Sequence, residues 1–203
     1  TGKLDQTEKL DVIKSEQQQI LSSRSYSPEQ AKMIADAQTE RNALATEIAH
    51  AAGLRAHELH TLQRLDERTS DPRPALEEKF TGREGERYTV EGKGGLVREV
   101  LIPKDLAERL EGRRLEQPLQ ITDRGVNYTS HYDINGGNRW SSSFTTASNR
   151  ALNWSTGAHG LRHSYAQERM DELKKSMPYE KALEVVSQEM GHFRTNITEV
   201  YLR

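Results

Sequence analysis

Apolar residues recur at helical spacing through the first quarter of the chain. Across residues 1–52, Leu, Ile and Ala mostly fall three or four positions apart among Glu, Gln and Lys, which is typical of amphipathic helices. The pattern breaks once, where Ser27 can cap a new helix, Pro28 occupies its first position and Gln30 completes a capping box. We therefore predict leading helices over residues 1–52, the last of which runs from Pro28 to a stop at Gly53.

A strand pattern comes next along the chain. Residues 86–91 and 96–102 contain Tyr, Thr, Val and Ile, which are enriched in strands. The segment Gly92-Lys93-Gly94-Gly95 between them indicates a turn, so the two strands are expected to form a β-hairpin with Lys93 at its tip. The pattern predicts a small antiparallel sheet within residues 60–102.

The remainder, residues 103–203, is predicted to be mainly helical. Apolar spacing and Pro, Gly or cap residues predict helices at 103–114, 144–152, 159–175, 178–190 and 195–203. Residues 116–158 are the least regular part, because Gly136-Gly137 and Ser141–Ser143 indicate flexible backbone. The whole chain is therefore predicted to be one α+β domain, mainly α.

Composition narrows the possible function classes. The 203 residues carry 29 Lys+Arg against 31 Asp+Glu, a formal charge of -2, so nucleic-acid binding would depend on where charges lie rather than on their excess. The absence of cysteine excludes disulfide scaffolds, thiolate metal sites and thiol nucleophiles. No run approaches the roughly 20 apolar residues of a membrane helix, and no signal peptide is visible. We expect a cytoplasmic protein with no membrane partner.

Two short motifs lie close together after Gly53. His57 and His60 in HELH resemble a zinc motif, but they are three residues apart, whereas the zinc-binding helical motif needs a spacing of four. No third ligand is evident, so we expect no metal. Arg55 in GLRAHEL precedes Glu58 by three residues. This pair is either a surface ion pair or a guanidinium held by a carboxylate and directed at a phosphate.

Four further candidates each have an ordinary interpretation. His159 and Arg162 in HGLRHSYA share one helical face, and an imidazole beside a fixed positive charge suits phosphoryl transfer. A solvated helix start would fit the same two residues. His192 in MGH can be a simple helix C-cap, Tyr201 a packing residue, and Lys93 a solvated turn residue.

The order of these residues resembles the tyrosine recombinase (phage integrase) family. The resemblance is carried by Arg55 in GLRAHEL, Lys93 in GKGG, His159 and Arg162 in HGLRHSYA, His192 in MGH, and Tyr201 in EVYLR. It covers residues 53–203, and its most specific parts are the HGLRH segment and the spacing from MGH to Tyr201. The resemblance implies a helical catalytic domain over 1–203, with leading helices at 1–52, a small three-stranded antiparallel sheet at 60–102 and helices at 103–203 that carry catalytic residues.

The resemblance also implies a reaction. Tyr201 would attack a DNA phosphodiester, leaving a 3′-phosphotyrosyl enzyme and a free 5′ hydroxyl, and Lys93 would protonate the leaving oxygen. A second strand's 5′ hydroxyl would then reverse the step, so no cofactor is implied. Tyrosine has a pKa near 10, so the attack at neutral pH needs a proton acceptor and a positively charged site.

The remaining roles follow from the same resemblance. His159 would be the acid/base partner, Arg55 and Arg162 would hold the non-bridging oxygens, and His192 would donate a hydrogen bond to the phosphate. Glu58 would support Arg55 rather than take part in catalysis.

The implied partners are double-stranded DNA, further copies assembled as a tetramer on DNA, and possible accessory proteins, with integration or excision of a mobile element as the expected purpose. We expect no N-terminal DNA-clamping domain in this chain and hence weak DNA affinity. Two alternatives remain open: a catalytically silent DNA-binding or adaptor module, and a phosphotransferase that uses His159 as its nucleophile.

Overall fold

The computed structural model describes residues 23–203, and the helical pattern predicted before Ser23 lies outside them. The helices are α2 (Pro28–Asp36), α3 (Glu40–Ala52), α4 (Lys104–Glu111), α5 (Gly137–Leu152), α6 (Gly160–Leu173), α7 (Tyr179–Glu189) and α8 (Thr195–Glu199), with short 3-10 turns η1 (Ala56–Thr61) and η2 (Val200–Leu202). The strands are β1 (Gln63–Arg64), β2 (Glu86–Glu91), β3 (Val97–Ile102), β4 (Arg114–Asp123) and β5 (Val126–Tyr132).

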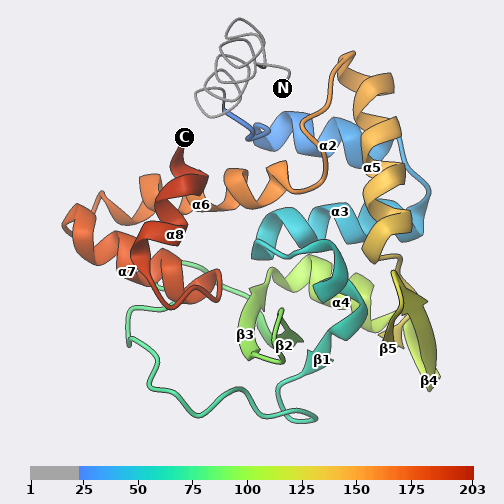
Figure 1. The fold of residues 1–203 in the computed structure, drawn as a ribbon, viewed down its shortest axis with the longest axis horizontal. Coiled ribbons are helices and arrows are strands. Elements are labelled where there is room, and N and C mark those ends of the chain that lie inside the picture. The colour runs from blue at the N-terminus through green and yellow to red at the C-terminus, as the bar shows by residue number, and fades with distance from the viewer. Residues whose placement is uncertain (1–22) are drawn as a thin grey trace, which may run out of the picture.

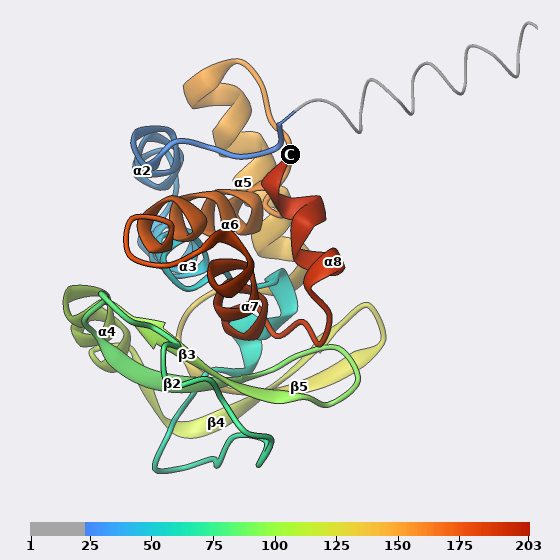
Figure 2. The ribbon, with the colours of Figure 1, turned by 90° about the vertical axis from the view of Figure 1, so that its left-hand side faces the viewer.

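The elements form two layers. Figure 1 shows α2, α3, α5 and α6 above the strands, with α4 directly below α3. Figure 2 shows the same division from the side, with α7 and α8 joining the helical layer and both sheets below it. The mainly helical α+β architecture predicted from the sequence is confirmed.

The predicted hairpin is confirmed. Strand β2 pairs antiparallel with β3 over six residue pairs, from Glu86 opposite Ile102 to Glu91 opposite Val97. Strand β1 adds to the other edge of β2, which gives a three-stranded sheet in the order β1-β2-β3. Val90 and Val100 are buried on its core side, so apolar burial fixes the register of the sheet.

Helices α2 and α3 are separate, whereas the sequence pattern predicted one continuous helix. Gln38 lies in the break, where its Oε1 accepts a hydrogen bond from Thr46 at 2.6 Å and its Nε2 donates to Ser143 in α5 at 3.2 Å. Trp140 Nε1 also donates to Thr46 Oγ1, at 3.0 Å. Buried polar groups require partners, and these contacts with α5 are made because the chain turns between the two helices.

The second sheet and the first part of α5, residues 137–143, were not predicted. Strands β4 and β5 form a two-stranded hairpin where the sequence indicated a helix end and flexible chain. Helix α5 begins at Gly137 rather than at Phe144, because Trp140, Phe144 and Ala147 bury one apolar face. Asp123, at the end of β4, accepts from the backbone N–H of Asn138 at 3.2 Å and so supports the start of that helix.

Close packing at Gly53 brings distant segments together. Gly53 ends α3 with φ +62°, and a Cβ added there would lie 2.8 Å from the Tyr165 ring in α6. Only glycine combines this backbone conformation with this approach at low cost. Tyr201 and Leu202 pack against a second apolar cluster formed by α6 and α7. Arg55, α6 and the C-terminal turn therefore meet in one place.

Candidate active site

Glu58 is the buried acidic centre of the site. It lies in η1, is fully buried, and its Oε2 accepts from the Arg55 backbone N–H at 2.8 Å and from Arg98 Nη2 at 2.8 Å. Its Oε1 accepts from Arg55 Nη1 at 3.1 Å. Burial by itself would raise the pKa of Glu58, but Arg98, Arg162 and Arg55 lower that pKa to about 2. The carboxylate is charged at neutral pH and holds Arg55 in place.

Arg162 is buried in the first turns of α6. Its Nη1 donates to the carbonyl of Gly53, and its Nη2 donates to the carbonyl of Met190 at 3.1 Å. Nη2 also lies 3.1 Å from His192 Nε2. Burial lowers the pKa of Arg162 to about 10, although Glu58 opposes that shift. Arg162 thus stays charged at neutral pH and is fixed by backbone carbonyls from two helix ends.

His192 follows Gly191 at the end of α7 and is buried. Its Nδ1 lies 2.8 Å from the Thr198 hydroxyl of α8. Burial, followed by the charges of Arg162 and Arg55, lowers the pKa of His192 to about 3, so the ring is neutral at pH 7.

The Tyr201 ring is surrounded by the other candidate residues. Its centroid lies 5.4 Å from that of His159, 4.8 Å from His163 and 5.3 Å from His192. The Arg162 guanidinium carbon lies 5.3 Å from the same centroid. Gln167 in α6 donates to the Tyr201 carbonyl at 3.1 Å, so α6 holds both the ring and the backbone of η2.

His159 is the N-cap residue of α6 and is exposed to solvent. Partial burial, then the charges of Arg162 and His163, lowers the pKa of His159 to about 4. The imidazole is therefore neutral at pH 7 and is available to accept a proton beside the Tyr201 ring.

Lys93 is the one candidate whose side chain is not drawn into the cluster. It is exposed at the hairpin tip. The base of its turn is nevertheless close, because a Cβ added at Gly92 would lie 3.4 Å from Glu58 Oε1 and 4.0 Å from Arg55 Nη1.

Arg98 is a central residue that sequence reasoning missed. It lies on β3, is 5% exposed, and bridges Glu58 to the Glu189 carbonyl, to which Nη1 donates at 2.6 Å. A Cβ added at Gly191 would lie 2.6 Å from Arg98 Cδ, so the glycine before His192 makes room for it. The only local signal was an arginine at an inward position of a predicted strand, where an apolar residue is usual.

Other nearby features do not form part of this cluster. His57 and His60 pack against Tyr128, with ring centroids 6.3 Å and 5.5 Å away. Residues 23–203 contain no group of three or more His, Asp or Glu placed to hold a metal ion. Over the same residues, no helix combines the length and apolar character needed to cross a bilayer.

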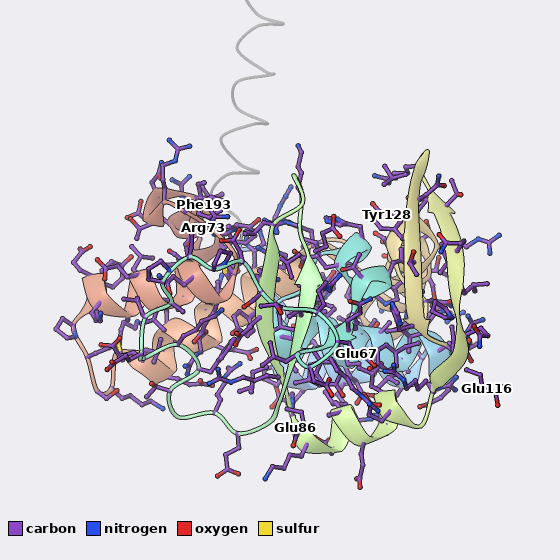
Figure 3. The ribbon with its side chains drawn as sticks, turned by 90° about the horizontal axis from the view of Figure 1, so that it is seen from below. Glu67, Arg73, Glu86, Glu116, Tyr128 and Phe193 are labelled. Carbon is purple, nitrogen blue, oxygen red and sulfur yellow. The ribbon has the colours of Figure 1, made fainter. Side chains whose placement is uncertain are left out.

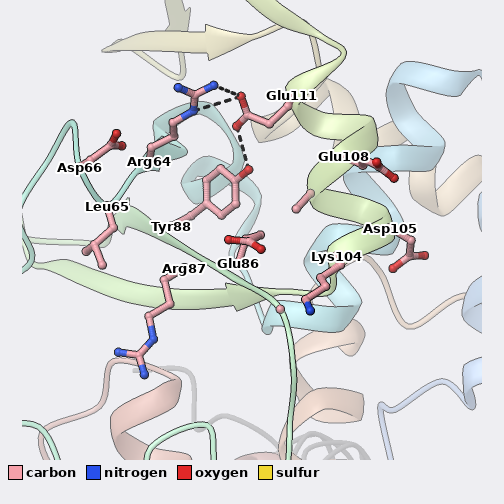
Figure 4. Close-up of a pocket in the computed structure, with 12 residues that line it drawn as sticks. Arg64, Leu65, Asp66, Glu86, Arg87, Tyr88, Lys104, Asp105, Glu108 and Glu111 are labelled. Atoms are coloured by element: carbon pink, nitrogen blue, oxygen red, sulfur yellow. Dashed lines mark hydrogen bonds and ion pairs between the residues drawn. The ribbon is translucent and has the colours of Figure 1, made fainter.

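Two cavities lie at different distances from the cluster. One of about 560 Å³ reaches His192 and Phe193, and there the Arg73 guanidinium lies 4.0 Å from the Phe193 ring centroid (Figure 3). Another, of about 1120 Å³, lies between β2 and α4 (Figure 4). In it Glu111 already accepts from Tyr88 at 2.8 Å and from Arg64, and none of the candidate residues lines it.

No protein-family model and no curated protein matches the chain. Solved structures do match it. The XerH site-specific recombinase bound to its difH substrate, in a pre-cleavage complex, is 20% identical with a TM-score of 0.53, over 89% of this chain and 50% of that one. XerH with a palindromic difH substrate, post-cleavage, is 18% identical with a TM-score of 0.54, over 88% of this chain and 49% of that one.

The Tn1549 transposon integrase in complex with transposon right-end DNA is 14% identical, with a TM-score of 0.51 over 89% of this chain and 61% of that one. The chain spans about half the length of the XerH structures it matches. These likenesses confirm that the chain has the catalytic-domain fold of tyrosine recombinases, as the resemblance in the sequence implied.

Proposed function

We propose that the chain is the catalytic domain of a tyrosine-type site-specific DNA recombinase, which cuts and rejoins DNA strands through a 3′-phosphotyrosyl intermediate. The observation that carries the proposal is the enclosure of the Tyr201 ring by His159, His192 and the Arg162 guanidinium, each within about 5.4 Å of its centroid. A phenol, neutral imidazoles and a fixed guanidinium at one place are the groups that nucleophilic attack on a phosphodiester needs.

Cleavage begins at the Tyr201 hydroxyl. His159, neutral because its pKa is lowered to about 4, accepts the phenolic proton as the Tyr201 oxygen bonds to phosphorus. Arg55 and Arg162 donate to the non-bridging oxygens and stabilise their negative charge. Glu58 keeps Arg55 oriented through the 3.1 Å bond between its Oε1 and Arg55 Nη1.

The bond from phosphorus to the 5′ oxygen breaks in the same step. Lys93 gives a proton to that oxygen, with the hairpin moving its exposed side chain onto the DNA. Rejoining is the reverse: a 5′ hydroxyl gives its proton to Lys93 and attacks the phosphotyrosine, the bond from phosphorus to the Tyr201 oxygen breaks, and His159 returns the proton that makes Tyr201 a phenol again. The number of phosphodiester bonds is unchanged, so the reaction needs no external energy source.

Double-stranded DNA is the proposed substrate. The XerH and Tn1549 structures that share the fold are DNA complexes, which supports this choice. We further propose that four copies assemble on DNA, with accessory proteins as possible additional partners, and that the purpose is integration or excision of a mobile element. The chain's formal charge of -2 predicts weak DNA binding by this domain alone.

Covalent trapping tests the proposal. A pool of randomised duplexes with a sulfur in place of the bridging 5′ oxygen releases a thiolate that rejoins poorly, so a cleaving enzyme accumulates a denaturant-resistant adduct. We expect mass mapping to find the DNA on Tyr201 and the Tyr201→Phe variant to form none. An adduct on His159 would indicate the phosphotransferase alternative, and DNA binding without any adduct would indicate a silent DNA-binding module.

A further inference from the structure

Thr198 joins the buried histidine to α8, which leads directly into the η2 turn that carries Tyr201. It is fully buried in α8, three residues before Tyr201. Its Oγ1 lies 2.8 Å from His192 Nδ1 and 2.7 Å from the hydroxyl of Ser187 in α7. One hydroxyl on α8 therefore contacts both α7 and the histidine that follows it.

The hydrogen-bond chemistry of the neighbours determines the tautomer of His192. Arg162 Nη2 lies 3.1 Å from His192 Nε2, and a guanidinium can only donate. Nε2 must therefore accept, so the ring proton is on Nδ1 and is donated to Thr198 Oγ1. In this form His192 orients Arg162 and has no proton to offer a phosphate.

A bound phosphate reverses this requirement. Phosphate oxygens accept hydrogen bonds, so a neutral His192 that donates to one must carry its proton on Nε2. Nδ1 then needs a donor, and a threonine hydroxyl can either donate or accept. The Ser187 hydroxyl lies 2.6 Å from the Leu183 carbonyl and 2.7 Å from the Thr198 hydroxyl. It can therefore either accept a hydrogen bond from Thr198 or donate one to it.

We propose that Thr198 is a positioning residue that allows His192 to change tautomer: Nε2 accepts from Arg162 in the empty site and donates to the phosphate in the occupied one. In this change Nδ1 of His192 loses one proton and Nε2 gains one, so the imidazole remains neutral. The inference rests on the proposed function, since the phosphate is taken to be the scissile one. The same hydroxyl also sets the position of Tyr201, because both residues lie on one short helical segment.

The tautomer is measured directly by nitrogen NMR of protein labelled with ¹⁵N-histidine. We expect His192 to be protonated on Nδ1 in the free protein and on Nε2 when orthovanadate fills the phosphate position. A free protein protonated on Nε2, or a vanadate complex still protonated on Nδ1, overturns the proposal. Neither NMR measurement requires DNA cleavage. The result for the tautomer can therefore fail while the recombinase assignment stands, and the reverse.

Two variants separate the hydroxyl from the shape of the side chain. Thr198→Val removes the hydroxyl at nearly constant volume and should abolish the Nδ1 hydrogen bond and slow adduct formation roughly tenfold. Thr198→Ser keeps the hydroxyl and should restore both the Nδ1 hydrogen bond and the rate of adduct formation. Thr195→Val makes the same substitution one helical turn earlier and serves as a matched control. Equal loss in the Val and Ser variants at the adduct step, with both still folded, would show that packing rather than the hydroxyl matters.

Discussion

Replacing Glu58 tests whether its buried carboxylate is stabilised by the surrounding arginines. Its side chain is 0% exposed, and those of Arg98 and Arg162 are 5% and 0% exposed. The lowering of its pKa from 4.5 to about 2 corresponds to about 3 kcal/mol, since one pKa unit is about 1.4 kcal/mol. Since the folded-state pKa is depressed, this stability is present above pH 4.5 and is lost as pH falls toward 2.

Glu58→Gln keeps the shape of the side chain but removes the charge. We expect it to lower the free energy of unfolding by about 3 kcal/mol at pH 7, since it leaves buried guanidiniums without their counter-ion. At roughly 2–4 °C per kcal/mol for a domain of this size, the melting temperature should fall by roughly 6–12 °C. The destabilisation caused by Glu58→Gln should be smaller at low pH, because Glu58 of the parent protein then also loses its charge.

Urea unfolding, followed by the fluorescence of buried Trp140, measures both effects at pH 7 and near pH 3. Glu40→Gln is the control, because Glu40 is 57% exposed in its ion pair with Arg109 and should cost less than about 1 kcal/mol. A Glu58→Gln protein within 0.5 kcal/mol of the parent at pH 7, at the low end for mutational effects, would refute the reasoning. So would a loss that is equally large at both pH values.

Three further predictions follow from the site and its supports. Lys93→Ala should slow cleavage of an ordinary duplex roughly 100-fold. It should not slow cleavage of a duplex with a 5′-bridging sulfur, because a thiolate leaves without being protonated. Equal slowing of both substrates in adduct assays would contradict the role of Lys93 as the acid. Gly53→Ala, with φ +62° and 2.8 Å from Tyr165, should cost more in thermal melts than Gly94→Ala, which has φ +82° but nothing within 4 Å. Burial lowers the pKa of His163 to about 4 and that of His192 to about 3, so stability should be lost as pH falls from 6.5 toward 3; a flat stability profile over that range would contradict it.

Local sequence signals predicted the elements whose ends and faces they specify. The capping box at Ser27 forms, with Gln30 N donating to Ser27 Oγ at 3.2 Å and Ser27 N donating to Gln30 Oε1 at 2.9 Å. The glycine-rich turn around Lys93 joins β2 to β3, and α6 begins at Gly160 in HGLRH. Each of these signals acts over a few residues, so sequence reasoning can recognise it.

Residues 114–143 show where local reasoning was wrong. The β4–β5 hairpin is exposed on most of both faces, so its sequence lacks the apolar alternation of a half-buried strand. Trp140, Phe144 and Ala147 have helical spacing, but the neighbouring Gly136-Gly137 and Ser141–Ser143 favour flexible backbone. Burial of that face against the rest of the core decided the conformation.

The sequence by itself determined which chemical groups are present and in what order: Arg55, Lys93, the His159–Arg162 pair, His192 and Tyr201. Tertiary structure alone decided that His159, Arg162 and His192 lie around the Tyr201 ring, that Arg55 and Arg98 share the charge of Glu58, and that Arg162 Nη2 lies against His192 Nε2. The physical reason is the distance along the sequence over which each interaction acts. Caps and turns depend on neighbours along the chain, whereas burial, charge compensation and tautomer depend on residues far apart in sequence that meet only when the core forms.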